Sequence, residues 1–361
     1  MHSWNCRARR TQLINLDFAT CLSFNNRCNA ICISSTCGTF NDYRNPTHLV
    51  RTKTTGDKSV KSRLVDFGYW LGWNALWIMP TRWAYYLFDK AAQIVWRREL
   101  NSIKQLELNL ARVLGCEVSD PRIRPLGLKT MQSYMRYYCE TFMLPRWSDE
   151  QLLGRVQAEN SEVVLDALKS GGAVLTLPHL ANWDWAGAWA ARYFGSLCTV
   201  AERLRPEGVF QKFLKARESR GITLMPLSGE GGTYEFLREH VNQGRLVALL
   251  GDRDVAKSGM SNEFFGHRTP LPIGAALLAL DTGRPLFTCA PWYDGEDLVI
   301  TFDAEVVFDR SPVQGRDRLR RAQEITKLVA ANFEKHISAH PDNWHQLQPV
   351  WPDLVFQEAT P

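Results

Sequence analysis

The stretch Ala173-Val-Leu-Thr-Leu-Pro-His-Leu-Ala-Asn-Trp-Asp184 decides the fold of this chain. Ala173–Leu177 is an unbroken apolar run introduced by two glycines, which is typical of a buried strand in a parallel sheet. The Ala- and Trp-rich residues 182–194 that follow predict a helix. His179 therefore belongs in the turn at the carboxyl end of a strand, where open α/β sheets bind their ligands.

The spacing of His179 and Asp184 indicates a particular chemistry. We expect Asp184, in the first turn of the helix, to hydrogen-bond one imidazole nitrogen and to set the tautomer of His179. The other nitrogen would then accept a proton from a hydroxyl group, which is general-base acyl transfer without a covalent enzyme intermediate. A histidine at a strand end is also often purely structural, so the pair alone does not decide between the two interpretations.

Alternating strand and helix patterns continue along the chain and predict an α/β fold with a mainly parallel central sheet flanked by helices. Residues 63–145 read as helical throughout, with a break at 119–125, and 146–352 as the α/β catalytic core. We therefore expect a single domain at 63–361 whose N-terminal part is a helical, membrane-associating subdomain. The predicted strands are 173–177, 197–200, 222–225, 246–250, 285–292 and 298–308, and the predicted helices are 163–168, 183–194, 209–220, 233–243, 274–282 and 316–340.

Charge and cysteine are both concentrated at the start of the chain. Residues 1–63 hold ten Lys and Arg against three Asp, a net charge of 10 − 3 = +7, so the remaining residues carry 5 − 7 = −2. The high isoelectric point therefore does not argue for nucleic acid. We interpret residues 1–62 as a disordered basic tail, which a start site assigned too far upstream would also explain. The four cysteines of the body indicate reduced core thiols of a cytosolic protein.

An aromatic segment precedes the α/β region. Trp70, Trp73 and Trp77 share one helical face, and basic residues follow them. A helix that lies in the headgroup layer of a membrane has this composition, and so has an aromatic core helix. The apolar run at 67–81 is shorter than the roughly 20 residues that a spanning helix needs.

Charged residues also follow the other predicted strands, and they converge on one crevice if the sheet is parallel. Glu202, Asp252 and Asp254 are candidates for a second acid beside His179. The candidates for holding phosphate groups are Arg203, Arg217 and Arg253, since a guanidinium binds phosphate through two nitrogens. Each of these residues taken alone is more simply a solvated loop charge. The sequence has no serine-hydrolase elbow, no phosphate-binding glycine loop and no H-E-x-x-H motif, and we expect no metal site and no cofactor.

Taken together, several motifs resemble those of the bacterial lipid A lauroyl/myristoyl acyltransferases, within the wider H-x4-D acyltransferases. More narrowly they resemble the phosphatidylinositol mannoside acyltransferases of actinobacteria. The motifs are H-L-A-N-W-D at 179–184, V-A-E-R-L at 200–204, Arg217 with Gly221, D-R-D at 252–254, F-F-G at 264–266, H-P-D-N-W-H-Q-L-Q-P at 340–349, L-G-W at 71–73, N-L-A-R-V-L-G at 109–115 and Y-M-R-Y-Y at 134–138.

The resemblance implies a peripheral enzyme at the cytoplasmic face of the cell membrane. It would move a palmitoyl chain from acyl-CoA, a substrate and not a cofactor, to the 6-hydroxyl of a mannose on a phosphatidylinositol mannoside. Its implied catalytic residues are His179 as the base, Asp252 as the supporting acid and Asp184 as the residue that orders the loop. The implied substrate-binding residues are Glu202, Arg217, Arg253, Asp254, Ser258 and Asp281, with Ser258 and Asp281 at the acyl donor.

Two residues depart from the family pattern. Ala181 stands where the family usually has glycine, and Asp252 is one methylene shorter than the Glu of some members. The alternative functions are acylation of lipid A or of a lysophospholipid, and lipid binding without catalysis. The intact His179 and Asp184 argue against the non-catalytic alternative.

Overall fold

The computed structural model describes residue 76 and residues 78–201, 207–226 and 232–357. The chain divides into two units, residues 1–58 and 59–361, and every described residue belongs to the second. The predictions for the tail at 1–62 and for the helix of Trp70, Trp73 and Trp77 lie outside the described residues.

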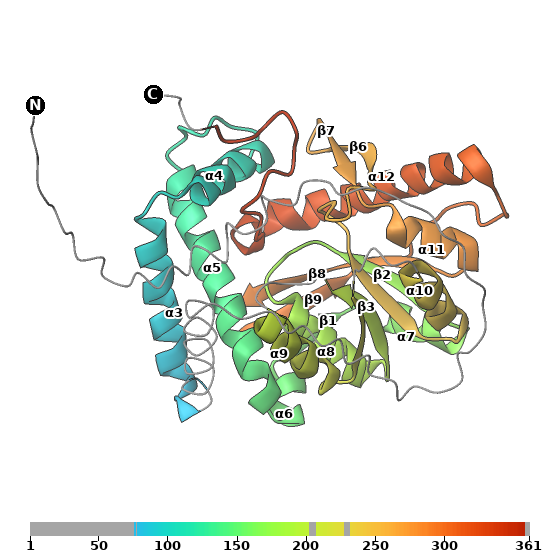
Figure 1. Cartoon of the computed structure of the whole chain (residues 1–361), viewed down its shortest axis with the longest axis horizontal. Helices are drawn as coiled ribbons and strands as arrows, with labels where there is room; N and C mark the ends of the chain where they lie inside the picture. The colour runs from blue at the N-terminus through green and yellow to red at the C-terminus, as the bar shows by residue number, and fades with distance from the viewer. Residues whose placement is uncertain (1–75, 77, 202–206, 227–231, 358–361) are drawn as a thin grey trace, which may run out of the picture. The chain divides into compact units, whose positions relative to one another are not determined.

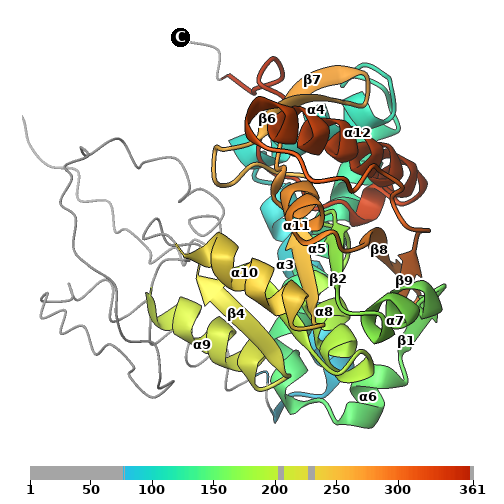
Figure 2. The ribbon, with the colours of Figure 1, turned by 90° about the vertical axis from the view of Figure 1, so that its right-hand side faces the viewer.

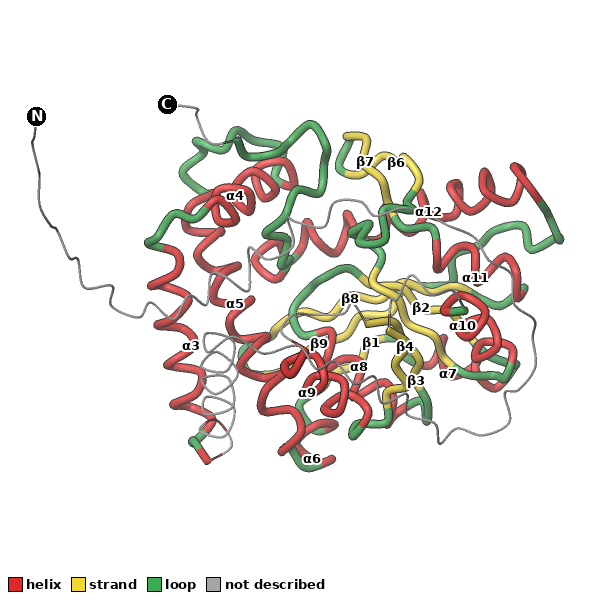
Figure 3. Tube along the Cα trace, viewed as in Figure 1, coloured by secondary structure: helices red, strands yellow, loops and turns green. Residues whose placement is uncertain are grey.

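A seven-stranded sheet forms the centre of this unit, with the strand order β1-β9-β8-β2-β5-β3-β4 (Figures 1 and 3). All neighbouring strands pair in parallel except β8 and β9. The prediction of a mainly parallel α/β sheet is therefore confirmed. The strands are β1 (Val156–Glu159), β2 (Ala173–Leu177), β3 (Leu197–Ala201), β4 (Ile222–Pro226), β5 (Leu246–Leu250), β8 (Leu286–Asp294) and β9 (Asp297–Phe302).

Helices cover both faces of the sheet, and the central strand β2 shows how. Its side chains alternate between the faces, so Ala173, Leu175 and Leu177 join one core cluster and Val174 joins the other. The first cluster takes residues from α5 (Ile123–Met143), α6 (Asp149–Leu153), α7 (Glu162–Lys169) and α8 (Trp183–Tyr193). The second takes residues from α10 (Thr233–Asn242), α11 (Gly274–Thr282) and α12 (Gly315–Ala339). Because both faces are covered, every residue of β2 is buried.

Three helices precede the sheet: α3 (Thr81–Trp96), α4 (Asn101–Val113) and α5 (Ile123–Met143). The helix α5 packs against α3 and α4 on one side and contacts α8 and the short helix η3 (Pro341–Asn343) on the other. The predicted break at 119–125 is too long, because α5 already includes Pro125 in its first turn. Proline is tolerated there, since the N–H groups of the first turn have no intrahelical acceptor. None of the described helices is long and apolar enough to cross a bilayer.

Two features were not predicted from the sequence. One is the short edge strand β1, and the other is a hairpin of β6 (Met260–Phe264) and β7 (His267–Leu271), which Figure 2 shows beside α12. Phe265 and Gly266 join the hairpin strands, and both have positive φ, as a two-residue type I′ turn requires. The predicted strand 298–308 is also too long, since β9 ends at Phe302. The remaining elements are α9 (Glu207–Glu218) and η2 (Leu144–Arg146).

Candidate active site

His179 lies two residues beyond the end of β2, at the carboxyl edge of the sheet. The turn that holds it is fixed by contacts to the C-terminal segment. Ala181 takes a left-handed conformation with φ of 42°, which suits the glycine usual in the resembled family. Its N–H donates to the carbonyl of Asn343 at 2.9 Å, and Leu180 forms a β-bridge with Trp344. The loop is thus bound on one side by a segment more than 150 residues away in the sequence.

Asp252 is the acid that contacts His179. Leu177 of β2 pairs with Leu250 of β5, so His179 and Asp252 both stand two residues past one paired position. The Oδ1 of Asp252 lies 2.5 Å from the Nδ1 of His179, and Oδ2 accepts the backbone N–H of His179 at 3.0 Å. One carboxylate therefore holds both the ring and the backbone of the histidine.

The C-terminal segment supplies two more donors to this carboxylate. The indole of Trp344 donates to Oδ2 of Asp252 at 2.8 Å, and the amide of Gln346 donates to the same oxygen at 3.0 Å. Burial raises the pKa of Asp252, but the charge of His179 and the hydrogen bonds lower it further, to about 2. Asp252 is therefore charged at neutral pH. No role was predicted for Trp344 and Gln346, although both lie in the motif at 340–349 that carries the family resemblance.

Asp184 does not contact His179, so the expectation that its carboxylate would hydrogen-bond the imidazole is wrong. Arg217 binds both of its oxygens, at 2.6 and 2.9 Å, and the hydroxyl of Tyr137 donates to it at 2.9 Å. The reason is geometric. From the first turn of α8, the side chain of Asp184 reaches Arg217 of α9 and Tyr137 of α5. The Nδ1 of His179 is already bonded to Asp252. Burial lowers the pKa of Arg217, but the charge and hydrogen bonds of Asp184, with those of Tyr137, together outweigh burial and raise it.

His345 is a second histidine at the site; it lies in the motif at 340–349, but no role was predicted for it. Its backbone N–H donates to the carbonyl of His179 at 2.9 Å, and its Nε2 lies 2.8 Å from the hydroxyl of Ser133. Its ring packs 5.8 Å from that of Trp183. Burial, and next the charge of His179, lower the pKa of His345 to about 3, so it is neutral at physiological pH.

Arg253, Asp254 and Ser258 follow Asp252 in the loop between β5 and β6. Arg253 is half-buried. Asp254 closes its own loop, because it accepts the N–H groups of Ser258 at 3.1 Å and of Gly259 at 2.8 Å. Ser258 is exposed. Glu202, by contrast, lies outside the described residues.

Asp281 lies away from His179. It accepts two bonds from Arg318, at 2.7 and 2.5 Å, and one from Tyr234. Arg318 lies near the start of α12, and the helix runs another 339 − 318 = 21 residues, about 32 Å, before the segment that reaches His179. The end of α11 that carries Asp281 leads into the start of β8, which is the opposite edge of the sheet. The structure therefore does not bring Asp281 to the other predicted site residues.

Comparison with known proteins identifies the family. The model of the bacterial lipid A biosynthesis acyltransferases matches residues 55–352, which is most of the chain. The chain belongs to this family. The chain is 35% identical to the phosphatidylinositol mannoside acyltransferase of Mycolicibacterium smegmatis, over 80% of this chain and 92% of the relative. It is 36% identical to the protein of the same name from Mycobacterium tuberculosis, over 81% of this chain and 90% of the relative. The resemblance predicted from the motifs is confirmed.

Among solved structures, the 1-acyl-sn-glycerophosphate acyltransferase PlsC of Thermotoga maritima is similar to this acyltransferase at a TM-score of 0.31 and 14% identity. The match covers 58% of this chain and 88% of that chain. A likeness of this extent supports no conclusion about this protein.

The geometry suits the chemistry of an acyltransferase. Because a carboxylate only accepts hydrogen bonds, the Nδ1 of His179 that faces Asp252 carries the proton, and Nε2 keeps its lone pair. No residue in the described part of the chain hydrogen-bonds Nε2, and the side chain of His179 is 13% exposed. Within the same part of the chain, no cluster of three His, Cys, Asp or Glu could hold a metal ion. The arrangement is that of a general base with a fixed tautomer.

Proposed function

We propose that this acyltransferase transfers a palmitoyl chain from acyl-CoA to the 6-hydroxyl of a mannose on a phosphatidylinositol mannoside. The catalytic part of the proposal depends on the contact between His179 and Asp252, which leaves Nε2 as the acceptor of the hydroxyl proton. The acceptor is proposed from the two mycobacterial relatives, whose names state that they acylate phosphatidylinositol mannoside.

The proposed reaction has two steps. The mannose oxygen attacks the thioester carbonyl while its proton moves to Nε2 of His179, and the ionised Asp252 stabilises the imidazolium. The tetrahedral intermediate then loses the thiolate of CoA as the carbon–sulfur bond breaks, and the imidazolium returns the proton to that sulfur. The products are the mannose ester and free CoA, and His179 is neutral again.

The pair of Asp184 and Arg217 has a supporting part in this proposal. The bidentate contact joins the first turn of α8 to α9, so it sets the position of the loop that carries His179. We assign Asp184 to ordering the loop and Arg217 to the wall of the acceptor site.

We also propose that the enzyme works at the cytoplasmic face of the membrane. The exposed face of α3 carries aromatic and aliphatic side chains, Trp83, Tyr86, Leu87 and Ile94, with Lys90 among them. A helix with this composition binds the boundary between headgroups and acyl chains, and its cations favour anionic lipid.

The experiment is transfer from radiolabelled palmitoyl-CoA to phosphatidylinositol mannosides, lysophospholipids and lipid A precursors, by the wild type and by His179→Ala. We expect label on the mannosides alone and none with the variant. Label on a different lipid would overturn the acceptor, and a variant that still turned over would overturn the base. Membrane association is tested by sedimentation with anionic vesicles, which Trp83→Ser together with Leu87→Ser should weaken.

A further inference from the structure

A pocket of about 410 Å³ lies between α3, α5, the turn from β8 to β9, and η3. Its volume falls in the range of small-molecule sites, about 300–1,000 Å³. Tyr293 lines it from the end of β8, which pairs in parallel with β2. The pocket therefore opens at the same edge of the sheet as His179.

Behind the lining of the pocket lies a buried carboxylate, Glu140, with no exposed surface. Three residues that line the pocket donate to it: Tyr85 at 3.0 Å, Tyr293 at 2.7 Å and Arg136 at 2.8 Å. A fourth donor, the amide of Asn182 at 2.9 Å, comes from the loop between His179 and Asp184. The walls of the pocket and the loop of the catalytic base are thus held by one side chain.

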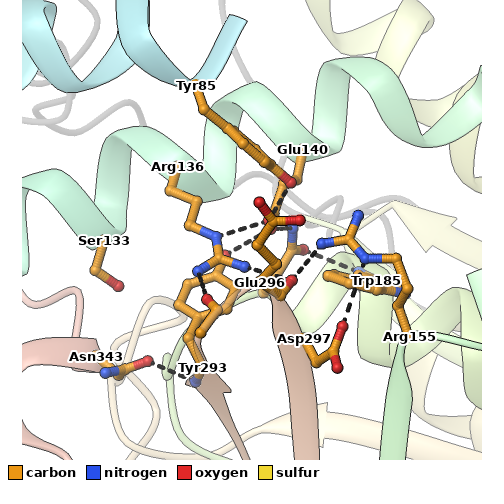
Figure 4. Close-up of polar contacts among 12 residues, drawn as sticks. Tyr85, Ser133, Arg136, Glu140, Arg155, Trp185, Tyr293, Glu296, Asp297 and Asn343 are labelled. Carbon is orange, nitrogen blue, oxygen red and sulfur yellow. Dashed lines mark hydrogen bonds and ion pairs between the residues drawn. The ribbon is translucent and has the colours of Figure 1, made fainter. Parts of the chain in front are cut away.

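Arg136 stiffens the pocket further. Its guanidinium donates to the carbonyls of Gly295 at 2.7 Å and Glu296 at 2.8 Å, and lies 3.7 Å from the ring centre of Tyr293. Figure 4 shows Tyr85, Arg136 and Tyr293 gathered around Glu140. Because these groups bond one another, the walls of the pocket are held in place by the protein itself, which lowers the cost of ordering them on binding.

A second set of contacts joins the pocket to His179. Ser133 lines the pocket and contacts His345, whose backbone donates to the carbonyl of His179. Asn343, also in the lining, accepts the N–H of Tyr293 through its side chain and that of Ala181 through its carbonyl. A ligand in the pocket would therefore lie against the loop that presents the base.

The lining identifies the class of ligand. It holds two cations, Lys129 and Arg136, and three anions, Asp89, Glu296 and Asp342, a formal charge of 2 − 3 = −1. The phosphates of CoA require a cationic site, and an acyl chain requires an apolar one. A sugar hydroxyl both donates and accepts, so it is satisfied by carboxylates, amides and cations together.

We propose that this pocket binds an uncharged sugar ring of the acceptor, one other than the mannose that is acylated. The proposal rests on the proposed function, since it takes the acceptor to be a glycolipid with more than one sugar. The rings of Tyr85, Phe88 and Tyr293 in the lining offer apolar surface to the faces of the sugar. The sugar bound in the pocket fixes the headgroup against the loop, so that the mannose to be acylated reaches His179.

The test uses Lys129→Ala with Asp342→Ala, which removes one cation and one anion and leaves the charge of the pocket unchanged. The matched control is Lys169→Ala with Asp166→Ala, an exposed ion pair on α7. Two quantities are measured: binding of free mannobiose by saturation-transfer NMR, and KM for acceptors that carry one mannose or two. We expect the pocket variant to lose the NMR signal and to raise KM for the two-mannose acceptor by about tenfold, which is a loss of one hydrogen-bonded subsite. The KM for the one-mannose acceptor and kcat should stay within about twofold of wild type.

An unchanged NMR signal in the pocket variant, no signal with wild type, or an equal rise in KM for both acceptors would overturn the proposal. The reaction assay and the binding assay distinguish this outcome from failure of the proposed function. If wild type acylates no mannoside but mannobiose binding still depends on Lys129 and Asp342, the reaction assignment fails and the pocket stands. If wild type acylates mannosides but mannobiose binding does not depend on Lys129 and Asp342, only the assignment of the pocket is wrong.

Discussion

Replacing Asp252 by asparagine is the sharpest perturbation of the site. An asparagine can keep its oxygen at the position of Oδ2, where His179 N–H, Trp344 and Gln346 all donate. Its amide nitrogen then faces the Nδ1 of His179. Because an amide nitrogen donates, Nδ1 must give up its proton, and Nε2 must carry one. The imidazole is left in the tautomer that cannot accept a proton from a hydroxyl.

The expected cost follows from this change of tautomer and from the lost negative charge beside the imidazolium. We expect kcat to fall by about 10³- to 10⁴-fold, which corresponds to about 4–5.5 kcal/mol of activation free energy. Three of the four hydrogen bonds to the side chain remain, so the free energy of unfolding should fall by only about 1–3 kcal/mol.

The assay is label transfer at saturating donor and acceptor, with urea unfolding measured on the same samples. Asp303→Asn is the matched control, because it disturbs a second His–Asp pair, with His336 of α12 at 2.9 Å. It should lower stability without a comparable loss of kcat. A loss of less than about tenfold in Asp252→Asn would refute the argument that the carboxylate sets the tautomer.

Three further predictions concern the surroundings of His179. Trp344→Phe removes one donor to Asp252 and should lower kcat by about tenfold at unchanged KM, measured by the same assay. Arg217→Met leaves Asp184 buried without its cation and should cost about 3–5 kcal/mol in urea unfolding, while Arg217→Lys should cost less. Because the pKa of His345 falls to about 3 in the fold, the unfolded chain binds a proton there below about pH 6.5 and the folded chain does not. Stability should therefore fall as pH drops from 6.5 towards 4, and His345→Gln should remove that part of the slope; a parallel slope would contradict it.

The local elements were predictable because each is specified by neighbouring residues. The apolar run at 173–177 has the length and composition of a buried strand, and β2 has these bounds. The strand β1 was missed because its four residues alternate in burial at a sheet edge and carry no apolar run. The hairpin β6–β7 was missed because Pro270 and several charged residues make its strands read as loop.

The partner of His179 could not be chosen from local sequence. Asp184 and Asp252 both had the right chemistry. The spacing along the chain favoured Asp184, and only the family resemblance named Asp252 as the supporting acid. The choice depends on β2 pairing with β5 and on the register of Leu177 with Leu250, and both arise from packing across the whole sheet. The same holds for Trp344 and Gln346, which reach the site only after α12 has crossed the molecule.

Because of the contacts from the C-terminal segment, the active site can form only late in protein synthesis. The loop of His179 is completed by groups as late as Gln346, so 346 − 179 = 167 residues must be made after the base before its acid has all its donors. At about 5–20 residues per second this takes roughly 10–30 s. Until then His179 has been synthesised, but Asp252 lacks the hydrogen bonds from Trp344 and Gln346. A chain released early therefore carries His179 without a complete active site. The acyltransferase therefore becomes active only as the last part of its core is added.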